Sequence, residues 1–274
     1  MVAFTLTEND GIAHLRFCNP KTSNAMGADF WAGFQPAIQA LSDAGSTRAL
    51  VISAEGKNFC SGMDISMFAG GIPSTQTPAD RDAFPALIRH LQNTISSLEA
   101  ARFPVIAAIQ GACIGGGLDL VAACDMRIAA ADAYFRVEET NIGMMADLGS
   151  LQRLPKLMPE GVVRELAYLG STLDAARGHT VGFLNAVEAD AEAALNAAME
   201  AAARIAAKAP LAIAGTKASI TYARDHSTAE ALNHAAMTQS LIWNTQDIQK
   251  AIMARAKGTD AEFDPLAKLR GLTD

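Results

Sequence analysis

The chain has 274 residues, enough for one large domain or for a domain with a helical extension. Half of the residues are apolar and 19% are charged, which is typical of a globular enzyme with a sizeable core. The formal net charge of −7 and the lack of a Lys/Arg run argue against nucleic acid as a partner. We expect no membrane partner either, because no apolar run approaches the roughly 20 residues that span a bilayer.

The four cysteines (Cys18, Cys60, Cys113 and Cys124) include no CxxC pair. Their apolar surroundings predict reduced, buried thiols and a reducing compartment. The histidines share no spacing typical of a metal site, so no metal is expected. The first residues already alternate like a strand, and Leu-Thr-Asp at the C-terminus is not a peroxisomal address, so we expect a cytoplasmic location.

The first predicted elements are two strands, FTLT and IAHLRF, joined by a turn whose Asp-Gly pair favours a hairpin. Asn24 is predicted to cap a helix, and Pro36 is a candidate kink or break in it. Its apolar face comprises Met26, Phe30, Phe34, Ile38 and Leu41. Residues 48–54 and 104–111 have the pattern of buried strands. Because helical patterns flank both, they predict βα units with parallel pairing.

Residues 70–80 have loop composition, and such a loop could cover a pocket. From about Ala189 the composition becomes that of Ala-rich helices, and no strand signal follows residue 188. Helices are predicted over 190–208, 211–225, 228–243 and 247–257, with Pro210 at one break. Their recurring apolar residues must bury against the core or a neighbouring subunit: Leu232, Met237, Leu241, Ile248 and Ile252.

Two glycine-bearing turns follow the predicted strands: KNFCSGMDI (57–65) and GACIGGGLDL (111–120). Each can present backbone N–H groups at the start of a helix. Two such donors from different loops can form an oxyanion hole, in which one donor contributes about 3–4 kcal/mol of transition-state stabilisation. The glycine triplet alone is explained equally well by close packing of a helix on a strand. A dinucleotide fingerprint is excluded, because its third glycine would fall on Leu120.

Three acids stand at or behind these glycines: Asp119, Glu139 and Asp147, the last two being eight positions apart. Carboxylates that converge on a pocket with N–H donors can stabilise an enolate and move protons around it. Each acid also has an ordinary interpretation. Asp119 could be a solvated or capping acid, Glu139 or its neighbour Glu138 a surface charge, and Asp147 a helix N-cap.

Four segments together resemble the crotonase, or enoyl-CoA hydratase/isomerase, superfamily: NAM (24–26), FCSGMDI (59–65), GACIGGGLDLVAACDMRIAA (111–130) and FRVEETNIGMMADLGSLQRLPKLM (135–158). The resemblance runs across nearly the whole chain. It implies an α/β fold, a spiral of ββα repeats with a C-terminal α-helical trimerisation region. We therefore expect a core at 1–190 that holds coenzyme A and the active site, and a helical oligomerisation region at 191–274.

The resemblance also implies roles for individual residues. The backbone N–H groups of Met63 and Gly116 would form the oxyanion hole for a thioester carbonyl. The catalytic acids would be Asp119, Glu139 and Asp147. The adenine and pantetheine of coenzyme A would lie along Ala25, Ser61, Asp64 and Ile65, beside Met63. No cofactor is implied, because coenzyme A is part of the substrate.

The acids distinguish the subfamilies. Hydratases of the superfamily usually have two glutamates at the positions of Asp119 and Glu139 and a glycine at that of Asp147. This chain is more similar to Δ3,5-Δ2,4-dienoyl-CoA isomerases, which have Asp, Glu and Asp. The resemblance implies an isomerase of 3,5-dienoyl-CoA in acyl-CoA degradation, a trimer or dimer of trimers. The alternatives are an enoyl-CoA hydratase, which adds water to 2-enoyl-CoA, and a non-catalytic acyl-CoA-binding member of the superfamily.

Our hypothesis is that Asp147 removes the C2 proton, that Glu139 protonates C6 and that Asp119 tunes or orients the pair. The reverse assignment of Glu139 and Asp147 stays open. Like charges in an apolar pocket should raise the pKa of at least one acid and keep it protonated at neutral pH. Met144 and Met145 are expected to line an apolar acyl pocket.

Overall fold

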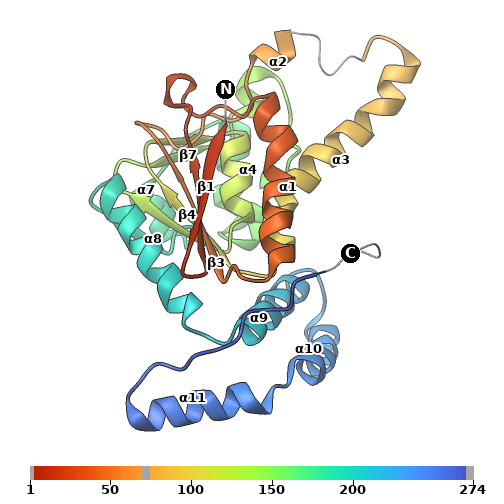
Figure 1. Ribbon diagram of the computed structural model, residues 1–274. Helices are drawn as coiled ribbons and strands as arrows, with labels where there is room; N and C mark the ends of the chain where they lie inside the picture. The colour runs from red at the N-terminus through yellow and green to blue at the C-terminus, as the bar shows by residue number, and fades with distance from the viewer. Residues whose placement is uncertain (1–2, 70–74, 270–274) are drawn as a thin grey trace.

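The computed structural model describes residues 3–69 and 75–269, which form two sheets enclosed by helices (Figure 1). A six-stranded sheet has the order β1-β2-β3-β4-β6-β9, and a three-stranded sheet has the order β5-β7-β8. The strands of the large sheet are β1 (Phe4–Asn9), β2 (Ile12–Phe17), β3 (Ala49–Ala54), β4 (Val105–Ile109), β6 (Met126–Ala130) and β9 (Ala186–Glu188). Those of the small sheet are β5 (Ala112–Ile114), β7 (Tyr134–Arg136) and β8 (Leu173–Asp174).

The strand pairings confirm both sequence predictions about the sheet. β1 and β2 form the antiparallel hairpin, whose turn places Asp10 and Gly11 at positive φ. From β2 onwards all pairings in the large sheet are parallel. β4 is followed by β5 and β6 by β7, so that successive segments send one strand to each sheet. This repeat matches the expected ββα spiral.

The central strands of the large sheet are buried on both faces, and alternate residues of β3 pack into different layers, whereas the edge strand β1 is largely exposed. Leu50 and Ile52 contribute to the main core, which includes side chains of α1 (Ala28–Ala44), α3 (Pro78–Ala100) and α4 (Gly116–Ala123). Ala49 and Val51 face the opposite layer, formed by α8 (Ala191–Ala206). The remaining helices of the core are α2 (Ser66–Ala69), α5 (Ser150–Arg153), α6 (Glu160–Leu169) and α7 (Ala175–Thr180), with 3₁₀ turns η1 (Pro20–Thr22), η2 (Glu139–Ile142) and η3 (Leu154–Lys156).

Helix α8 lies flat on the sheet because small residues recur every four positions along it. Ala194, Ala198 and Ala202 are buried against Val51, Ile106 and their neighbours. Alanine side chains at i, i+4 and i+8 share one helix face and let the helix approach closely. The Ala-rich composition near residue 190 therefore marks a sheet-packing helix.

The N-terminal end of α1 differs from the sequence prediction. The helix begins at Ala28 after Gly27, which makes no side-chain cap, and it continues through Pro36 to Ala44 without a break. Asn24, the predicted cap, is buried, and its amide donates to the carbonyls of Glu55 and Asn58 at 2.9 Å each. The residue preferences that favour an N-cap also suit a positive-φ residue in a loop, and Asn24 has φ +56°.

The predicted loop at 70–80 is partly wrong, and its first residues, 70–74, lie outside the described residues. Helix α3 already begins at Pro78, where Thr77 and Asp80 form a capping box. Proline at the first helical position after a threonine cap is a favourable helix start, although the composition of the segment favours a loop. The predicted burial of the cysteines is confirmed for Cys60, Cys113 and Cys124, whereas Cys18 is only partly buried.

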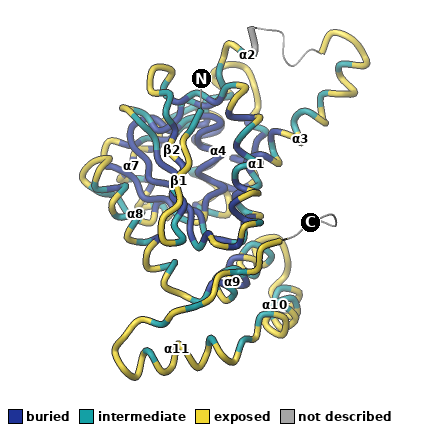
Figure 2. Tube along the Cα trace, viewed as in Figure 1, coloured by how far each residue is buried: buried dark blue, intermediate teal, exposed yellow. Residues whose placement is uncertain are grey.

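The C-terminal helices α9 (Pro210–Ala223), α10 (Thr228–Ile242) and α11 (Thr245–Lys257) follow the predicted ranges closely and lie at one end of the core (Figure 1). Figure 2 shows α10 and α11 largely exposed. Leu232, Met237, Leu241 and Ile252 have 63–84% of their surface exposed, so the chain's own core does not cover them. Among the described helices, none has the length and apolarity to span a membrane.

Candidate active site

The two glycine-bearing turns run side by side because the loop at 57–65 pairs with β5. The Cys60 N–H donates to the Ala112 carbonyl, and the Ile114 N–H donates to the Cys60 carbonyl, both at 3.0 Å. Gly62 has φ +88°, and a methyl group there would lie 3.1 Å from the Gly116 nitrogen. Glycine therefore permits both the backbone conformation and the close approach of the two turns.

The backbone N–H groups of Met63 and Gly116 are available to a ligand. Gly116 is the first residue of α4, where a helix leaves its N–H groups without intrahelical acceptors. Within the described part of the chain, neither N–H donates a hydrogen bond, and both residues line the same cavity. Two N–H donors from adjacent turns in one cavity can bind a carbonyl oxygen that develops negative charge.

The glycine triplet both supplies an N–H group to the cavity and permits close packing of α4 against the loop at 57–65. Gly115 has φ +54°, and a methyl group there would lie 3.4 Å from Oε1 of Glu139. Gly116 supplies the cavity N–H. A methyl group on Gly117 would come within 2.9 Å of the Cys60 carbonyl oxygen, so this glycine is needed for close packing.

The cavity has a volume of about 580 Å³, and most of its lining side chains are apolar. Helix α3 supplies one wall, and the loop after η2 supplies Met144 and Met145, as the sequence predicted. The apolar lining residues are Met63, Ile65, Met67, Phe84, Leu87, Ile88, Leu91, Ile114, Ile142, Met144, Met145 and Leu148. Such a surface suits an acyl chain, with polar groups confined to a few positions.

The structure places two of the three acids in this cavity and the third behind it. Glu139 and Asp147 line the cavity. Asp119 lies in the first turn of α4, has no exposed surface and is not among the lining residues. Its Oδ1 accepts hydrogen bonds from the N–H and hydroxyl of Ser150, at 2.5 and 2.7 Å. Asp119 is thus positioned to act on the other acids through its charge.

The pKa of each acid is raised, chiefly by burial. Burial and the nearby charge of Asp119 raise the pKa of Glu139 to about 7. Burial raises the pKa of Asp119 to about 6, although its hydrogen bonds to Ser150 and the Arg153 guanidinium oppose the shift. Burial also raises the pKa of Asp147. A protonated Glu139 beside an ionised carboxylate is therefore accessible near neutral pH, as proton transfer requires.

The surroundings of Asp119, Asp147 and Glu138 decide between their ordinary and their catalytic interpretations. Asp119 is not solvated and does not cap its own helix α4, whose N-cap is Gly115; it accepts instead the backbone N–H of Ser150, the first residue of α5. The N-cap of α5 is Gly149, which makes no side-chain cap, so Asp147 does not have that role. Glu138 also borders the cavity and pairs with Arg136.

The residues expected along the coenzyme A path differ in their contact with the cavity. Ser61 and the 76%-exposed Ile65 line the cavity. Ala25 and Asp64 are not among its lining residues. They flank the bridge between Met26 and Met63, and the Asp64 N–H donates to the Met26 carbonyl at 3.1 Å. Asn24 secures this region by bonding the loop at 57–65.

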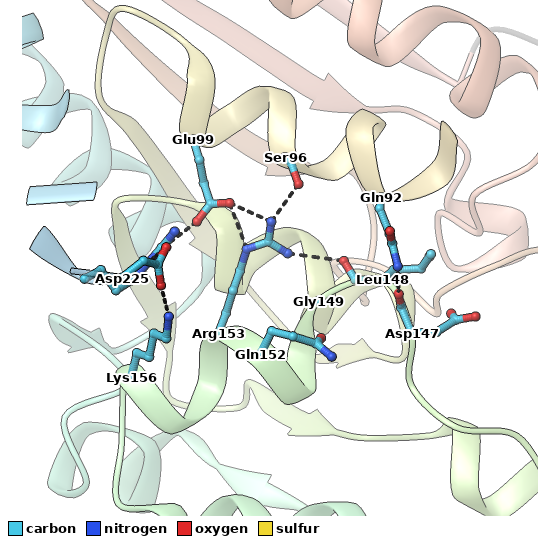
Figure 3. Close-up of a pocket in the computed structure, with 11 residues that line it drawn as sticks. Gln92, Ser96, Glu99, Asp147, Leu148, Gly149, Gln152, Arg153, Lys156 and Asp225 are labelled. Carbon is cyan, nitrogen blue, oxygen red and sulfur yellow. Dashed lines mark hydrogen bonds and ion pairs between the residues drawn. The ribbon is translucent and has the colours of Figure 1, made fainter. Parts of the chain in front are cut away.

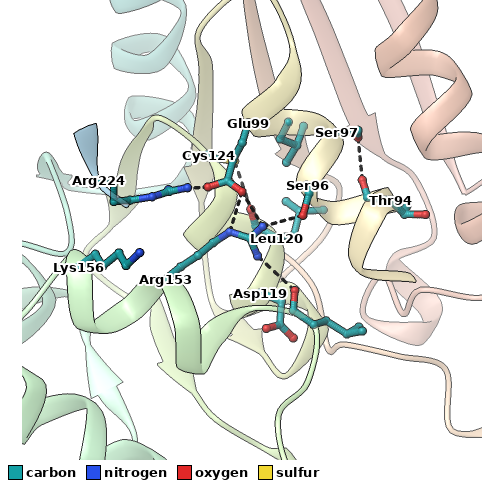
Figure 4. A network of polar contacts seen from close by, with 12 residues as sticks. Thr94, Ser96, Ser97, Glu99, Asp119, Leu120, Cys124, Arg153, Lys156 and Arg224 are labelled. Carbon is teal, nitrogen blue, oxygen red and sulfur yellow. Dashed lines mark hydrogen bonds and ion pairs between the residues drawn. The ribbon is translucent and has the colours of Figure 1, made fainter. Parts of the chain in front are cut away.

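Sequence reasoning missed Arg153 and Glu99 as parts of the site. Arg153 is buried and ion-paired with Glu99 at 2.6 Å, close to Asp119 (Figure 4). The two residues are 54 positions apart, on α5 and α3, and no local pattern connects them. The sequence feature that could have identified them is that each is a charged residue in an otherwise apolar segment. Across the described residues, no group of three or more His, Cys, Asp or Glu side chains is arranged to hold a metal ion.

A family model for enoyl-CoA hydratase/isomerase matches residues 7–264 of the chain. The chain belongs to the enoyl-CoA hydratase/isomerase family. This confirms the resemblance drawn from the motifs, and the family acts on acyl-CoA thioesters.

Curated relatives within the family include dienoyl-CoA isomerases. The chain is 38% identical to the mitochondrial Δ3,5-Δ2,4-dienoyl-CoA isomerase of Rattus norvegicus, over 94% of this chain and 80% of the relative. It is 32% identical to the peroxisomal Δ3,5-Δ2,4-dienoyl-CoA isomerase of Arabidopsis thaliana, over 94% of each chain. A probable mitochondrial enoyl-CoA hydratase 2 of Arabidopsis thaliana is 31% identical, over 91% of this chain and 80% of that one.

Solved structures confirm the crotonase fold with its C-terminal helical region. An enoyl-CoA hydratase from Polaromonas sp. JS666 superimposes with a TM-score of 0.86 at 27% identity, covering 95% of this chain and 99% of that one. A putative enoyl-CoA hydratase from Streptomyces coelicolor A3(2) gives a TM-score of 0.87 at 28% identity, covering 96% and 94%.

Proposed function

We propose that this chain isomerises 3,5-dienoyl-CoA to 2,4-dienoyl-CoA. The observation that carries the proposal is that Glu139 and Asp147 line one apolar cavity together with the free N–H groups of Met63 and Gly116. The names of the relatives that are 37–38% identical to the chain support the same reaction.

The first step is removal of a proton from C2. The N–H groups of Met63 and Gly116 hold the thioester oxygen, on which negative charge develops, and the Asp147 carboxylate accepts the proton. The electron pair of the C2–H bond passes into an enolate that is conjugated with both C=C bonds of the acyl chain, C3=C4 and C5=C6. The charge can therefore react at the far end of the conjugated system.

The second step is protonation of C6 by Glu139. Its pKa of about 7 leaves a large fraction of this carboxyl protonated at neutral pH, whereas an ordinary glutamate would be ionised. After one turnover Asp147 carries a proton and Glu139 lacks one, so transfer through water must restore both acids. Two acids fit this reaction because one carboxyl cannot readily reach both C2 and C6.

Asp119 raises the pKa of Glu139 without contacting the substrate. Its charge is the second largest cause of the shift at Glu139 after burial. We assign it as the acid that keeps Glu139 protonated. Ser150 holds it in place through the two hydrogen bonds to Oδ1.

Coenzyme A would enter at the rim formed by Ser61 and Ile65, with Ala25 and Asp64 beside it. We further propose that the chain acts as a homotrimer or dimer of trimers, with residues 1–190 as the catalytic core. Within the predicted oligomerisation region, 191–274, α8 packs on the sheet of the core, so the subunit contacts are assigned to α9, α10 and α11. Support comes from the exposed apolar residues of α10 and α11, which suit a subunit contact. A cytoplasmic location remains a prediction, and the isomerase relatives have mitochondrial or peroxisomal names.

The test is to add 3,5-dienoyl-CoA to the purified protein and follow the near-ultraviolet absorbance of the conjugated 2,4-dienoyl thioester. We expect isomerisation that Asp147→Asn abolishes. A parallel assay offers 2-enoyl-CoA. Hydration without isomerisation would contradict the proposal and identify a hydratase, and acyl-CoA binding without turnover of either substrate would identify a non-catalytic member.

A further inference from the structure

A second cavity lies on the other side of the loop that carries Asp147. It has a volume of about 480 Å³, and Asp147 and Leu148 line both cavities. Its other walls come from α3, from the region of α5 and from the end of α9 (Figure 3). These walls are polar and charged. In Figure 3 the Asp147 carboxyl points away from the ion-paired side chains, so these side chains act on the loop rather than on the carboxyl.

The centre of this wall is the carboxylate of Glu99, which bonds a guanidinium on each side. Arg224 Nη1 donates to Oε1 at 2.5 Å, and Arg153 donates to Oε2 from Nε at 3.0 Å and from Nη2 at 2.6 Å (Figure 4). The exposed fractions of the side chains are 15% for Glu99, 11% for Arg153 and 29% for Arg224. Removing one partner would therefore leave a largely buried charge, unlike the loss of a surface pair.

Arg153 extends this chain of contacts to the acid-bearing loop. Its Nη1 donates to the Leu148 carbonyl at 3.2 Å, and its Nη2 donates to the Ser96 hydroxyl at 2.8 Å. Gly149 has φ +132°, and a methyl group there would lie 1.7 Å from Nη1 of Arg153. The loop is therefore shaped around the guanidinium. Asp147 precedes this contact, and Ser150, which holds Asp119, follows it.

Arg224 brings a distant part of the chain into the same network. It is the C-cap residue of α9, 125 positions from Glu99, and α9 packs against α10. The position of the C-terminal helices is thus connected through Arg224, Glu99 and Arg153 to the backbone beside Asp147.

We propose that Glu99 and Arg224 are positioning residues for the acid site, through which the docked C-terminal helices fix the loop from Asp147 to Ser150. The inference rests on the proposed function. Neither residue lines the acyl cavity, so their effect passes through Arg153. Movement of a reacting group by about 1 Å can lower a rate up to a hundredfold.

The chain offers a matched control for this network. Lys156, on η3, pairs with Asp225, the residue after Arg224. This second ion pair joins the same end of α9 to the same region of the core. Among the described residues it makes no hydrogen bond to Leu148 or Gly149, and it approaches Arg224 only through Asp225, whose Oδ2 lies 3.8 Å from Arg224 Nε. Lys156→Met therefore removes an ion pair at the end of α9 while the bonds of Glu99 to Arg153 and Arg224 stay in place.

The experiment measures kcat and KM for 3,5-dienoyl-CoA in Arg224→Met, Arg224→Lys, Glu99→Gln and Lys156→Met. We expect Arg224→Met and Glu99→Gln to lower kcat about tenfold, with little change in KM, because the acids move while the apolar cavity stays. Arg224→Lys should recover most of the rate, and Lys156→Met should match the unchanged protein. An equal loss in Lys156→Met, or a loss confined to KM, would overturn the proposal.

A second measurement does not depend on turnover: titration of the Asp119 carboxyl by ¹³C NMR. Arg153 lowers the pKa of Asp119, and the other titratable groups near Asp119 are Glu139, Asp147 and Cys113. Glu99→Gln removes the negative charge that balances Arg153, so the pKa of Asp119 should fall, whereas Lys156→Met should leave it unchanged. An unaltered Asp119 titration in folded Glu99→Gln would overturn the inference.

Absence of isomerisation in the unchanged protein would contradict the proposed function, and the NMR titration would still decide whether Glu99 acts on the acid site.

Discussion

Ser150 donates two hydrogen bonds to the same oxygen of Asp119, one from its backbone N–H at 2.5 Å and one from its hydroxyl at 2.7 Å. The second oxygen, Oδ2, is buried, and no partner for it lies among the described residues. Asp119 is therefore held in one orientation while half of its carboxylate lacks stabilisation. Such an acid is costly to ionise, and its charge acts strongly on its neighbours.

The first prediction concerns this cost. The pKa of Asp119 rises from about 3.8 in the unfolded chain to about 6 when folded. The folded state therefore binds the proton more tightly, and the free energy of unfolding falls as pH rises from about 4 to about 6. Asp119→Asn removes the buried carboxylate charge. It should therefore raise the free energy of unfolding at pH 8 by about 1–2 kcal/mol.

Urea unfolding of both proteins at fixed concentration, at pH 8 and at pH 4.5, measures this difference. The gain should be smaller at pH 4.5, where Asp119 is largely protonated in the folded state although it is still mostly ionised in the unfolded chain. An equal gain at both pH values would show that the effect does not come from ionisation of Asp119.

The second prediction is the pH dependence of isomerisation. Glu139 must be protonated to serve C6, and its pKa is about 7, so kcat/KM should fall about tenfold per pH unit well above pH 7. Asp147 must be ionised, so activity should also fall in acid, as pH drops through its raised pKa. Initial rates from pH 5 to pH 9 measure both limbs.

In Asp119→Asn the alkaline limb should move to lower pH, because one cause of the raised pKa of Glu139 is lost. An alkaline limb that stays in place would mean that Glu139 does not sense Asp119.

The third prediction separates the two acids that line the acyl cavity. In deuterated water, Glu139→Gln should still exchange the C2 hydrogen of bound substrate while isomerisation falls by a factor of about 100 or more. Asp147→Asn should lose both exchange and isomerisation. Mass spectrometry of recovered substrate reports the exchange. If Asp147→Asn retains C2 exchange and Glu139→Gln loses it, the two roles are reversed.

The fourth prediction concerns the glycine triplet. Gly117→Ala should destabilise the protein by about 1–3 kcal/mol, because the new methyl group would meet the Cys60 carbonyl oxygen at 2.9 Å. Gly161→Ala is the matched control. Gly161 also lies in a helix, but nothing approaches its methyl position within 4 Å, so this change should stabilise by about 0.5–1 kcal/mol. Urea midpoints of the two variants should move in opposite directions.

The fifth prediction concerns self-association. Leu241 on α10 has 84% of its surface exposed, so Leu241→Glu should dissociate the proposed trimer by placing a charge in an apolar contact. Sedimentation velocity measures the change, and Lys257→Glu at the end of α11 controls for charge alone. An unchanged sedimentation coefficient in Leu241→Glu would exclude this face of α10 from the subunit contact.

Local patterns in the sequence were sufficient for the first four strands, for the C-terminal helices and for the family. Alternation and the Asp-Gly turn predicted the β1–β2 hairpin, and the apolar run at 48–54 predicted the buried strand that the structure has at Ala49–Ala54, because these signals involve residues adjacent in the chain. The motifs around Met63, Gly116 and the three acids were also continuous stretches, and they were enough to place the chain in its family.

Only the tertiary structure decided which polar groups meet. It buried Asn24 in a loop, where the residue preference for a helix cap applied equally to a positive-φ position. It placed Glu139 and Asp147 in the cavity and Asp119 behind it, although spacing alone treated the three acids alike. It also joined Glu99, Arg153 and Arg224 from three distant helical segments. Burial and ion pairing depend on packing between elements far apart in sequence, and these interactions set the pKa of each acid.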